Sequence, residues 1–275
     1  MIHDQRSALS SHINGLLSAG RVVFTAQEAE HGLGLNRGAF LDAAERLQRR
    51  KALIRLRQGF YVAVPPQFAS WGSPPPSWYI DALMRHEQRP YYVGLLKAAE
   101  LHGATHQAVM EFQVVTGKRM PKIKAGRNLI VFYFRKDIAR VEAGIENRKT
   151  DTGTMKISSP ALTALDLLRY PQASGGLDNV ATVLADLGEK ISPDQLAVLS
   201  DMTERPVVQR LGYLLDRLGH LDRTGLMHTA LIARGPPAWT ELDRQEIRDP
   251  VFTREPQERD DRWQVIVRRT PEVDE

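Results

Sequence analysis

The spacing of hydrophobic residues over positions 1–64 predicts three helices followed by a hairpin. Apolar residues of the first helix recur at helical intervals, at Leu9, Ile13, Leu16 and Leu17. The second helix begins with a capping-box pattern, Thr25 to Glu28, and ends near residue 31. Between these helices lies a short apolar stretch at 22–24, which is placed to cover an edge of the hairpin's sheet.

The third helix and the hairpin are the best defined elements of this region. One face of the helix collects Phe40, Leu41, Ala44 and Leu47, and Asn36 is the expected N-cap. Residues 53–56 then take strand character, Gln58-Gly59 supplies a turn, and residues 60–62 return as the second strand. Three helices and a hairpin in this order are typical of a winged helix-turn-helix, with the hairpin as its wing.

Positive charge gathers on the third helix and the wing. Residues 46–57 contain six basic residues and no acidic one. The phosphates of duplex DNA are the natural partner of such a surface. We expect the start of the third helix to contact bases, and the wing to contact the DNA backbone or the minor groove. The residues expected at the DNA are Thr25, Gln27, Asn36, Arg37, Arg46, Arg49, Arg50, Lys51, Arg55, Arg57 and Gln58.

The alternative is a winged fold that serves only protein contacts, with the basic run as a solvated face. Asp42 and Glu45 favour this alternative, because they lie on the outward face of the third helix and repel phosphates. An acid can, however, also accept a hydrogen bond from cytosine in the major groove. Sequence preference cannot be read from these residues.

The composition is that of a globular chain of about two domains. The formal net charge is +4, but residues 1–62 carry nine Lys and Arg against five Asp and Glu, whereas residues 240–275 carry seven against eleven. The acidic tail therefore either repels competing partners or touches the basic head.

Two absences narrow the function classes. The chain has no cysteine, which excludes disulfides, thiolate zinc sites and cysteine nucleophiles. It also lacks an apolar signal core and any run of about 18 apolar residues, so that neither secretion nor membrane insertion is indicated. We expect a cytoplasmic protein.

Prolines mark the expected domain boundary. Pro65-Pro66 and Pro74-Pro75-Pro76 enclose a stretch with serine and glycine, a composition that breaks helices. We expect a winged helix-turn-helix domain at 1–64, a proline-rich linker at 65–76 and a larger mixed α/β domain at 77–275. The fold class is therefore α+β.

Within the larger domain, helices and strands are mixed. Strands are expected at 111–116, 129–134, 153–157 and 263–267. Helices are expected at 78–86, 92–102, 178–187, 193–201 and 205–218, and another follows the N-cap and proline pattern Ser159-Pro160 as far as Tyr170.

Five segments, taken together, resemble the AbiEi family, the antitoxins of type IV toxin–antitoxin pairs. They are RLRQGFYV (55–62), YYVGLLKAAELHGA (91–104), EFQVVT (111–116), KISSPALTALDLL (156–168) and RLGYLLD (210–216). Each is degenerate alone, but their order and spacing cover most of the chain. Residues past Pro236 match weakly, and Ala161 and Leu162 stand where family members often have a charged residue.

The resemblance implies a winged amino-terminal domain that binds inverted repeats at its own promoter, and a larger domain that neutralises a nucleotidyltransferase-like toxin. Direct contact with the toxin and dimerisation on the DNA stay open. The resemblance also implies an antitoxin rather than an enzyme.

A search for catalytic or metal-binding patterns finds weak candidates. His102 and His106 have i, i+4 spacing, but Gly103 intervenes and no HExxH pattern is present. Asp166 is a lone carboxylate in an apolar helix, without the paired group that general acid–base catalysis usually needs. We expect no catalytic residue, no metal and no cofactor.

A second basic surface is expected between the strands at 111–116 and 129–134. It consists of Lys118, Arg119, Lys122, Lys124 and Arg127. The interpretations are a solvated loop, additional contacts to the DNA backbone, or recognition of an acidic or nucleic-acid partner.

The sequence thus predicts a DNA-binding repressor and antitoxin. One rival is an enzyme, a nuclease or nucleotide-handling fold targeted by the winged module, although the cluster of acids and lysine around a strand that metal-dependent cleavage needs is missing. The other rival is a protein-interaction adaptor, which predicts no salt-sensitive DNA binding.

Overall fold

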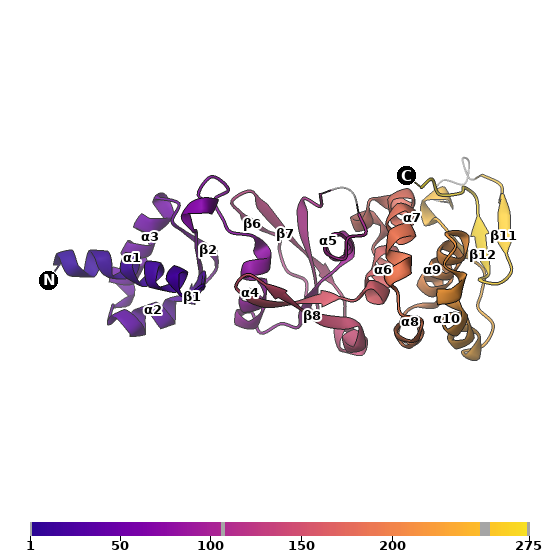
Figure 1. Ribbon diagram of the computed structural model, residues 1–275, viewed down its shortest axis with the longest axis horizontal. Helices are drawn as coiled ribbons and strands as arrows, with labels where there is room; N and C mark the ends of the chain where they lie inside the picture. Colours follow the sequence, from indigo (N-terminus) through magenta and orange to yellow (C-terminus); the bar gives the residue numbers. More distant parts are fainter. Residues whose placement is uncertain (1, 106–107, 248–253, 274–275) are drawn as a thin grey trace. The chain divides into compact units, whose positions relative to one another are not determined.

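The computed structural model describes residues 2–105, 108–247 and 254–273 (Figure 1). The chain divides into two compact units. The first consists of residues 1–92, 110–136 and 147–156, and the second of residues 93–109, 137–146 and 157–275. The proline-rich segment 65–76 therefore lies inside the first unit, which extends well past residue 64.

The first 64 residues have the element order of a winged helix. The helices are α1 (Ile2–Ser18), α2 (Ala26–Leu33) and α3 (Arg37–Arg49), and the strands are β1 (Val23–Thr25), β2 (Leu53–Arg57) and β3 (Phe60–Ala63). The strands form an antiparallel sheet of order β1-β3-β2. The predicted helices and hairpin are confirmed, and so is the placement of the 22–24 stretch at the sheet edge.

An aromatic cluster holds these elements together. Phe24 from β1 stacks on Tyr61 from β3 with 5.7 Å between ring centroids, and Phe40 from α3 meets the same ring edge-on at 5.3 Å. All three side chains are buried, each contributing about 1.5–3 kcal/mol of hydrophobic stabilisation. The buried stripe of α3 consists of Phe40, Ala43, Ala44 and Leu47, whereas Leu41, which was expected in it, is 40% exposed. This stripe fixes the orientation of α3 against the wing and leaves its polar face outward.

The rest of the first unit is built on most of a six-stranded sheet of order β6-β7-β5-β4-β9-β8. The strands are β4 (Tyr91–Val93), β5 (Glu111–Thr116), β6 (Ile123–Ala125), β7 (Asn128–Phe134), β8 (Ile145–Thr150) and β9 (Gly153–Ser158). β5 and β7 are parallel, and β6 runs antiparallel to β7 at one edge. The short helices are η1 (Pro66–Phe68), η2 (Pro76–Trp78) and α4 (Ile80–His86).

Two predictions for this region need correction. The helix expected at 92–102 begins only at Leu95, because Tyr91–Val93 forms β4, as favoured by its aromatic and β-branched side chains. The basic stretch expected to be a loop contains β6, a short strand that pairs with β7 through Ile123 and Ile130. β8 was not predicted, since its sequence is polar.

The second unit is mainly helical. Its helices are α5 (Leu95–Leu101), η3 (Ile138–Gly144), α6 (Pro160–Arg169), η4 (Pro171–Ser174), α7 (Gly176–Leu187), η5 (Gly188–Lys190), α8 (Pro193–Asp201), α9 (Arg205–Arg217), α10 (Leu221–Ala233) and η6 (Arg244–Ile247). α6 contacts α5, α7, α8 and α9, so that every residue from Ala161 to Leu168 is buried. α10 was not predicted, and the remaining long helices are confirmed within a few residues.

A small sheet closes the second unit against α9. Its strands are β10 (Thr240–Glu241), β11 (Glu258–Asp260) and β12 (Val265–Val267), in the order β10-β12-β11. Trp263, which is fully buried, lies over Gly212, where an added Cβ would stand 2.4 Å from the indole ring. Its indole nitrogen donates to Asp216 Oδ2 at 2.7 Å. The mixed helix and strand content agrees with the expected fold class.

Candidate nucleic-acid interface

Capping interactions use two of the polar side chains expected at DNA. Thr25 Oγ1 accepts from Glu28 N at 3.1 Å, and Thr25 N donates to Glu28 Oε2 at 2.7 Å, which completes the predicted capping box of α2. Asn36 Oδ1 accepts from Ala39 N at 2.9 Å and caps α3. Gln27 and Arg37 remain exposed, Arg37 being 3.8 Å from Glu30.

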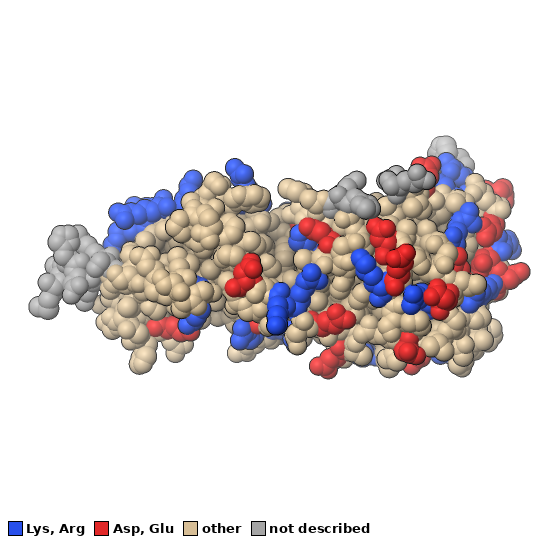
Figure 2. Space-filling model, in the orientation of Figure 1, with Lys and Arg blue, Asp and Glu red and all other residues tan. Residues whose placement is uncertain are grey.

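The end of α3 and the start of the wing carry exposed positive charge. Arg46, Arg50, Lys51 and Arg55 all face solvent, and none of them has an acidic partner within the described part of the chain. Figure 2 shows Lys and Arg side chains along one edge of the molecule, over α3 and the elements beside it. We call these four residues the helix–wing patch.

The acid on the outward face of α3 is partly neutralised. Glu45 accepts from Arg49 at 2.7 Å, in an i, i+4 pair on the exposed surface. Asp42 is exposed one turn earlier. The repulsion expected from Glu45 is therefore offset by Arg49, and the helix–wing patch keeps its net positive charge.

Lys51 has an unusual backbone conformation. It ends α3 with φ +57°, in the left-handed region that favours glycine. Lys51 N donates to Gln48 O at 2.9 Å and Ala52 N donates to Leu47 O at 3.0 Å, the hydrogen bonds of a helix end that usually has glycine in this place. The helix end thus presents a cationic side chain at a cost in backbone energy.

The wing is anchored within the first unit. Arg57 Nη2 donates to Pro121 O at 3.0 Å, and Arg57 Nε lies 3.4 Å from Glu87 Oε1. The carbonyl oxygen of Gln58 is 3.0 Å from His86 Nε2. The structure therefore separates two arginines that the sequence places together, since the Arg55 side chain is exposed and that of Arg57 is engaged by the protein.

The second basic surface lies beside the wing, because β2 contacts β6. Lys118, Lys122 and Lys124 are exposed, whereas the two arginines lie over aromatic rings. Arg119 stands 5.4 Å from the ring centroid of Phe134, and Arg127 stands 5.7 Å from that of Trp71. Sequence reasoning missed these aromatic partners, although an acid-free basic stretch next to aromatic residues was a usable signal.

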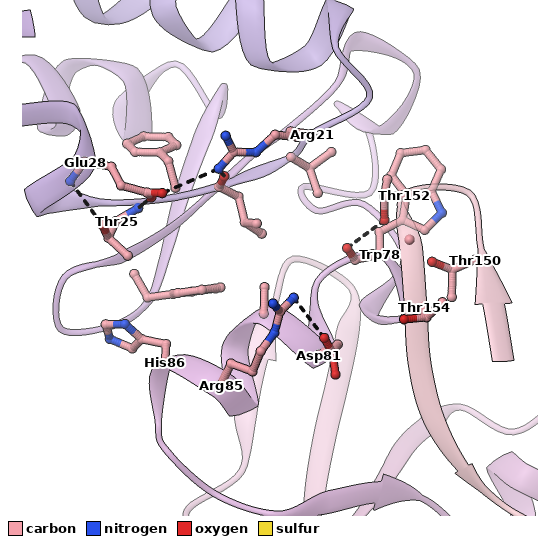
Figure 3. A pocket seen from close by; sticks show the side chains of 16 residues that line it. Arg21, Thr25, Glu28, Trp78, Asp81, Arg85, His86, Thr150, Thr152 and Thr154 are labelled. Carbon is pink, nitrogen blue, oxygen red and sulfur yellow. Dashed lines mark hydrogen bonds and ion pairs between the residues drawn. The ribbon is translucent and has the colours of Figure 1, made fainter. Parts of the chain in front are cut away.

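A cavity of about 610 Å³ also lies in the first unit (Figure 3). Arg21 and Arg85 both line it, but Arg21 is 3.6 Å from Glu28 and Arg85 is 2.9 Å from Asp81. These ion pairs leave the lining with little net charge. The cavity could not be found from sequence, because its residues come from β1, α2, β3, η2, α4, β8, β9 and the loops beside them.

Two of the three residues considered for catalysis or metal binding lie within the described part of the chain. His102 Nε2 is 2.7 Å from Ser158 O, and His106 lies outside the described residues. Asp166 is fully buried in α6. Among the residues that the structure describes, no group of three His, Asp or Glu side chains is arranged to hold a metal ion.

Comparison with known proteins gives a fold neighbour and a family. The crystal structure of the RV2827C protein from Mycobacterium tuberculosis is similar with a TM-score of 0.66, at 18% sequence identity, over 95% of this chain and 91% of that chain. No curated protein matches. Across the described residues, none of the helices is both long and apolar enough to cross a membrane.

The family model matches just under half of the chain. Residues 92–217 match the AbiEi antitoxin C-terminal domain. This range runs from β4 to the end of α9 and contains four of the five segments on which the resemblance rests, the first of them from its second residue. This match, over just under half of the chain, supports the resemblance to the AbiEi antitoxins.

Proposed function

We propose that this antitoxin binds duplex DNA through its amino-terminal winged helix, represses its own operon and counteracts a nucleotidyltransferase-like toxin. The observation that carries the DNA-binding part is the helix–wing patch, whose four cations are exposed and lack acidic partners among the described residues. Unpaired surface cations bind phosphates by releasing counterions, without first breaking ion pairs within the protein.

The two parts of the proposed interface have different tasks. The side chains of Gln27 and Arg37, at the start of α2 and α3, are exposed, and we assign to them the contacts with base edges in the major groove. The helix–wing patch supplies backbone contacts, which position the protein without reading sequence. Two copies on an inverted repeat would place their α3 helices one or more DNA turns apart.

The experiment measures affinity for the DNA upstream of the antitoxin's own operon by fluorescence anisotropy. Reversing two charges of the patch, Arg50→Glu with Arg55→Glu, should weaken binding at least ten-fold, to both upstream and scrambled duplexes. The matched control reverses Lys149 and Lys156, exposed residues on β8 and β9 of the first unit. Equal affinity of the patch variant and the wild type would reject the proposed interface.

Toxin neutralisation is tested separately. Co-expression of the chain with the nucleotidyltransferase-like toxin should restore growth, and the Arg50→Glu, Arg55→Glu variant should restore it equally when both genes are under a foreign promoter. This separation is expected because the matched antitoxin domain lies outside the winged helix. Failure of the wild type to restore growth would contradict the antitoxin part of the proposal alone.

A further inference from the structure

The acid-free stretch with the most basic residues lies outside the winged helix. Residues 112–136 contain seven Lys and Arg and no Asp or Glu. They include β6, the edge strand of the six-stranded sheet, and its neighbour β7. The opposite edge strand, β8, has Glu146 beside Arg148 and Lys149. The β6 edge therefore differs from it in carrying basic residues without an acid.

Exposed aromatic rings accompany this charge. Trp71 is 51% exposed and Phe134 is 37% exposed. Each ring carries the guanidinium of one arginine, Arg127 on Trp71 and Arg119 on Phe134. An exposed ring with a cation beside it suits a nucleic-acid base, which stacks on the ring and brings a phosphate near the charge.

The backbone around Trp71 is held firmly. Arg127 N donates to Trp71 O at 2.9 Å, and Gly126 has φ +58° in the turn between β6 and β7. A Cβ added at Gly126 would lie 2.2 Å from Trp71 O. Only glycine permits this close approach, which fixes Trp71 beside the turn.

The two cation–ring pairs mark the two ends of β7. Arg127 precedes its first residue, Asn128, and Phe134 is its last. At about 3.3 Å per residue, these ends are roughly 20 Å apart. The exposed Lys122 and Lys124 lie on the β6 side of this strand. The edge strand β6 thus brings lysines alongside β7, whose two ends carry the two rings.

We propose that this edge binds single-stranded nucleic acid, with unpaired bases stacked at Trp71 and Phe134 and phosphates held by the lysines of the second basic surface. A duplex would satisfy the charges but not the rings, since its bases are already stacked on one another. Recognition by stacking and phosphate contacts is tolerant of sequence. The site shares no residue with the proposed duplex interface on α3 and the wing.

The test uses the full chain and fluorescein-labelled oligomers of uridine or thymidine, about 12 nucleotides long, in fluorescence anisotropy. Trp71→Leu should weaken binding of both oligomers about ten-fold, because stacking on one aromatic ring typically contributes a factor of this size or more. Trp239→Leu is the matched control, since Trp239 is also exposed and carries Arg259 at 5.9 Å, but lies in the acidic carboxyl-terminal region.

Charge is tested in the same way. Lys122→Glu with Lys124→Glu should abolish oligomer binding, whereas the Lys149 and Lys156 reversal should leave it within about three-fold of the wild type. The Arg50→Glu, Arg55→Glu variant should also keep oligomer binding while losing duplex binding, so that the two proposals fail separately. Tighter binding of the uridine oligomer indicates RNA as the ligand, and tighter binding of the thymidine oligomer indicates DNA.

Several outcomes would overturn the inference. One is that neither oligomer binds the wild-type chain, and another is that Trp71→Leu binds both as tightly as Trp239→Leu does. If the lysine reversal weakens binding of a hairpin duplex and leaves the oligomers unaffected, the edge belongs to the duplex interface instead. The Phe134→Leu variant tests the second ring in the same way. It keeps an apolar side chain at this position, so that the sheet should still fold.

Discussion

The arginines of the winged helix and those near the carboxyl terminus have the same chemistry but opposite surroundings. In the winged helix, Arg46, Arg50 and Arg55 are exposed without an acidic partner among the described residues. In the second unit, Arg268 holds Glu241 through two nitrogens, at 2.9 and 3.1 Å, and Arg269 lies 2.7 Å from Asp178.

This difference shows why the count of charges along the chain is a poor guide to function. Residues 240–275 contain 18 charged residues, more than the 14 in residues 1–62. Several of their charges are taken up within the second unit, where Tyr213 and Arg217 also meet Glu258. Paired charges hold the fold, whereas unpaired charges are available to an external anion.

The largest expected effect is on the stability of the second unit, where the charges are paired. Trp263→Ala should lower the free energy of unfolding by about 3–5 kcal/mol, because it empties a fully buried site and leaves Asp216 without the indole donor. Chemical denaturation measures this loss. Trp263→Phe should lose less, since it keeps a ring against Gly212.

Duplex affinity is the control for that prediction. At a temperature where the second unit of the Trp263→Phe variant is folded, its affinity for duplex DNA should equal that of the wild type. A large loss of affinity in this variant would mean that the carboxyl-terminal sheet takes part in DNA binding, against the division proposed above.

Arg55 and Arg57 lie on the same strand, β2, so that an unpaired and a paired arginine can be compared at neighbouring positions. Arg57→Ala should lower stability by about 1–3 kcal/mol, because it leaves Glu87 and the carbonyl of Pro121 without their donor. Arg55→Ala should leave stability unchanged and reduce the slope of log affinity against log salt by about 1. Thermal melts and salt titrations of both variants test this. A loss of stability in Arg55→Ala together with a reduced salt slope in Arg57→Ala would contradict it.

Lys51→Gly should change stability and affinity in opposite directions. Glycine relieves the left-handed conformation and should raise stability by about 1 kcal/mol, while the loss of one cation weakens DNA binding several-fold. Gln88→Gly is a matched control, since Gln88 has φ +53° and ends α4 with the same pair of hydrogen bonds. This control should gain stability and keep its affinity.

The smallest effect is a pH dependence in the second unit. The hydrogen bond from Arg269, with a second from Glu272 N, lowers the pKa of Asp178 below its ordinary value of 3.8. The folded chain therefore binds the proton less readily than the unfolded chain, and this stabilisation is present above pH 3.8 and lost as the pH falls below it. The Asp178→Asn variant should be less stable than the wild type at neutral pH. This deficit in the free energy of unfolding should shrink as the pH falls below 3.8.

A deficit of Asp178→Asn that stays constant as the pH falls would show that the Arg269 contact does not depend on the carboxylate charge. Salt should also reduce the deficit at neutral pH, because the Asp178 side chain is 46% exposed.

The elements that sequence predicts well are those with local signals. Asn36 and the capping box of Thr25 mark helix starts through hydrogen bonds to residues three positions later, so that the sequence alone contains both partners. The wing hairpin is similar, because a single turn at Gly59 brings its strands together.

The features that sequence reasoning missed depend on distant partners. β8 is polar and becomes a strand only at the edge of the six-stranded sheet. Arg57 looks like Arg55 until the fold brings Glu87 and Pro121 to it. The pairing of Arg127 with Trp71 likewise joins residues separated by more than fifty positions. Which charges are free is therefore a property of the fold.

The dependence of duplex affinity on salt tests the central claim most directly. Four unpaired cations in the helix–wing patch predict a slope of log affinity against log salt of about −3.6 from this patch. The Arg50→Glu, Arg55→Glu variant should lose about 2 units of that slope, and the reversal of Lys149 and Lys156 should lose none. Identical slopes for the wild type and both variants would contradict the account, because the patch would then release no counterions.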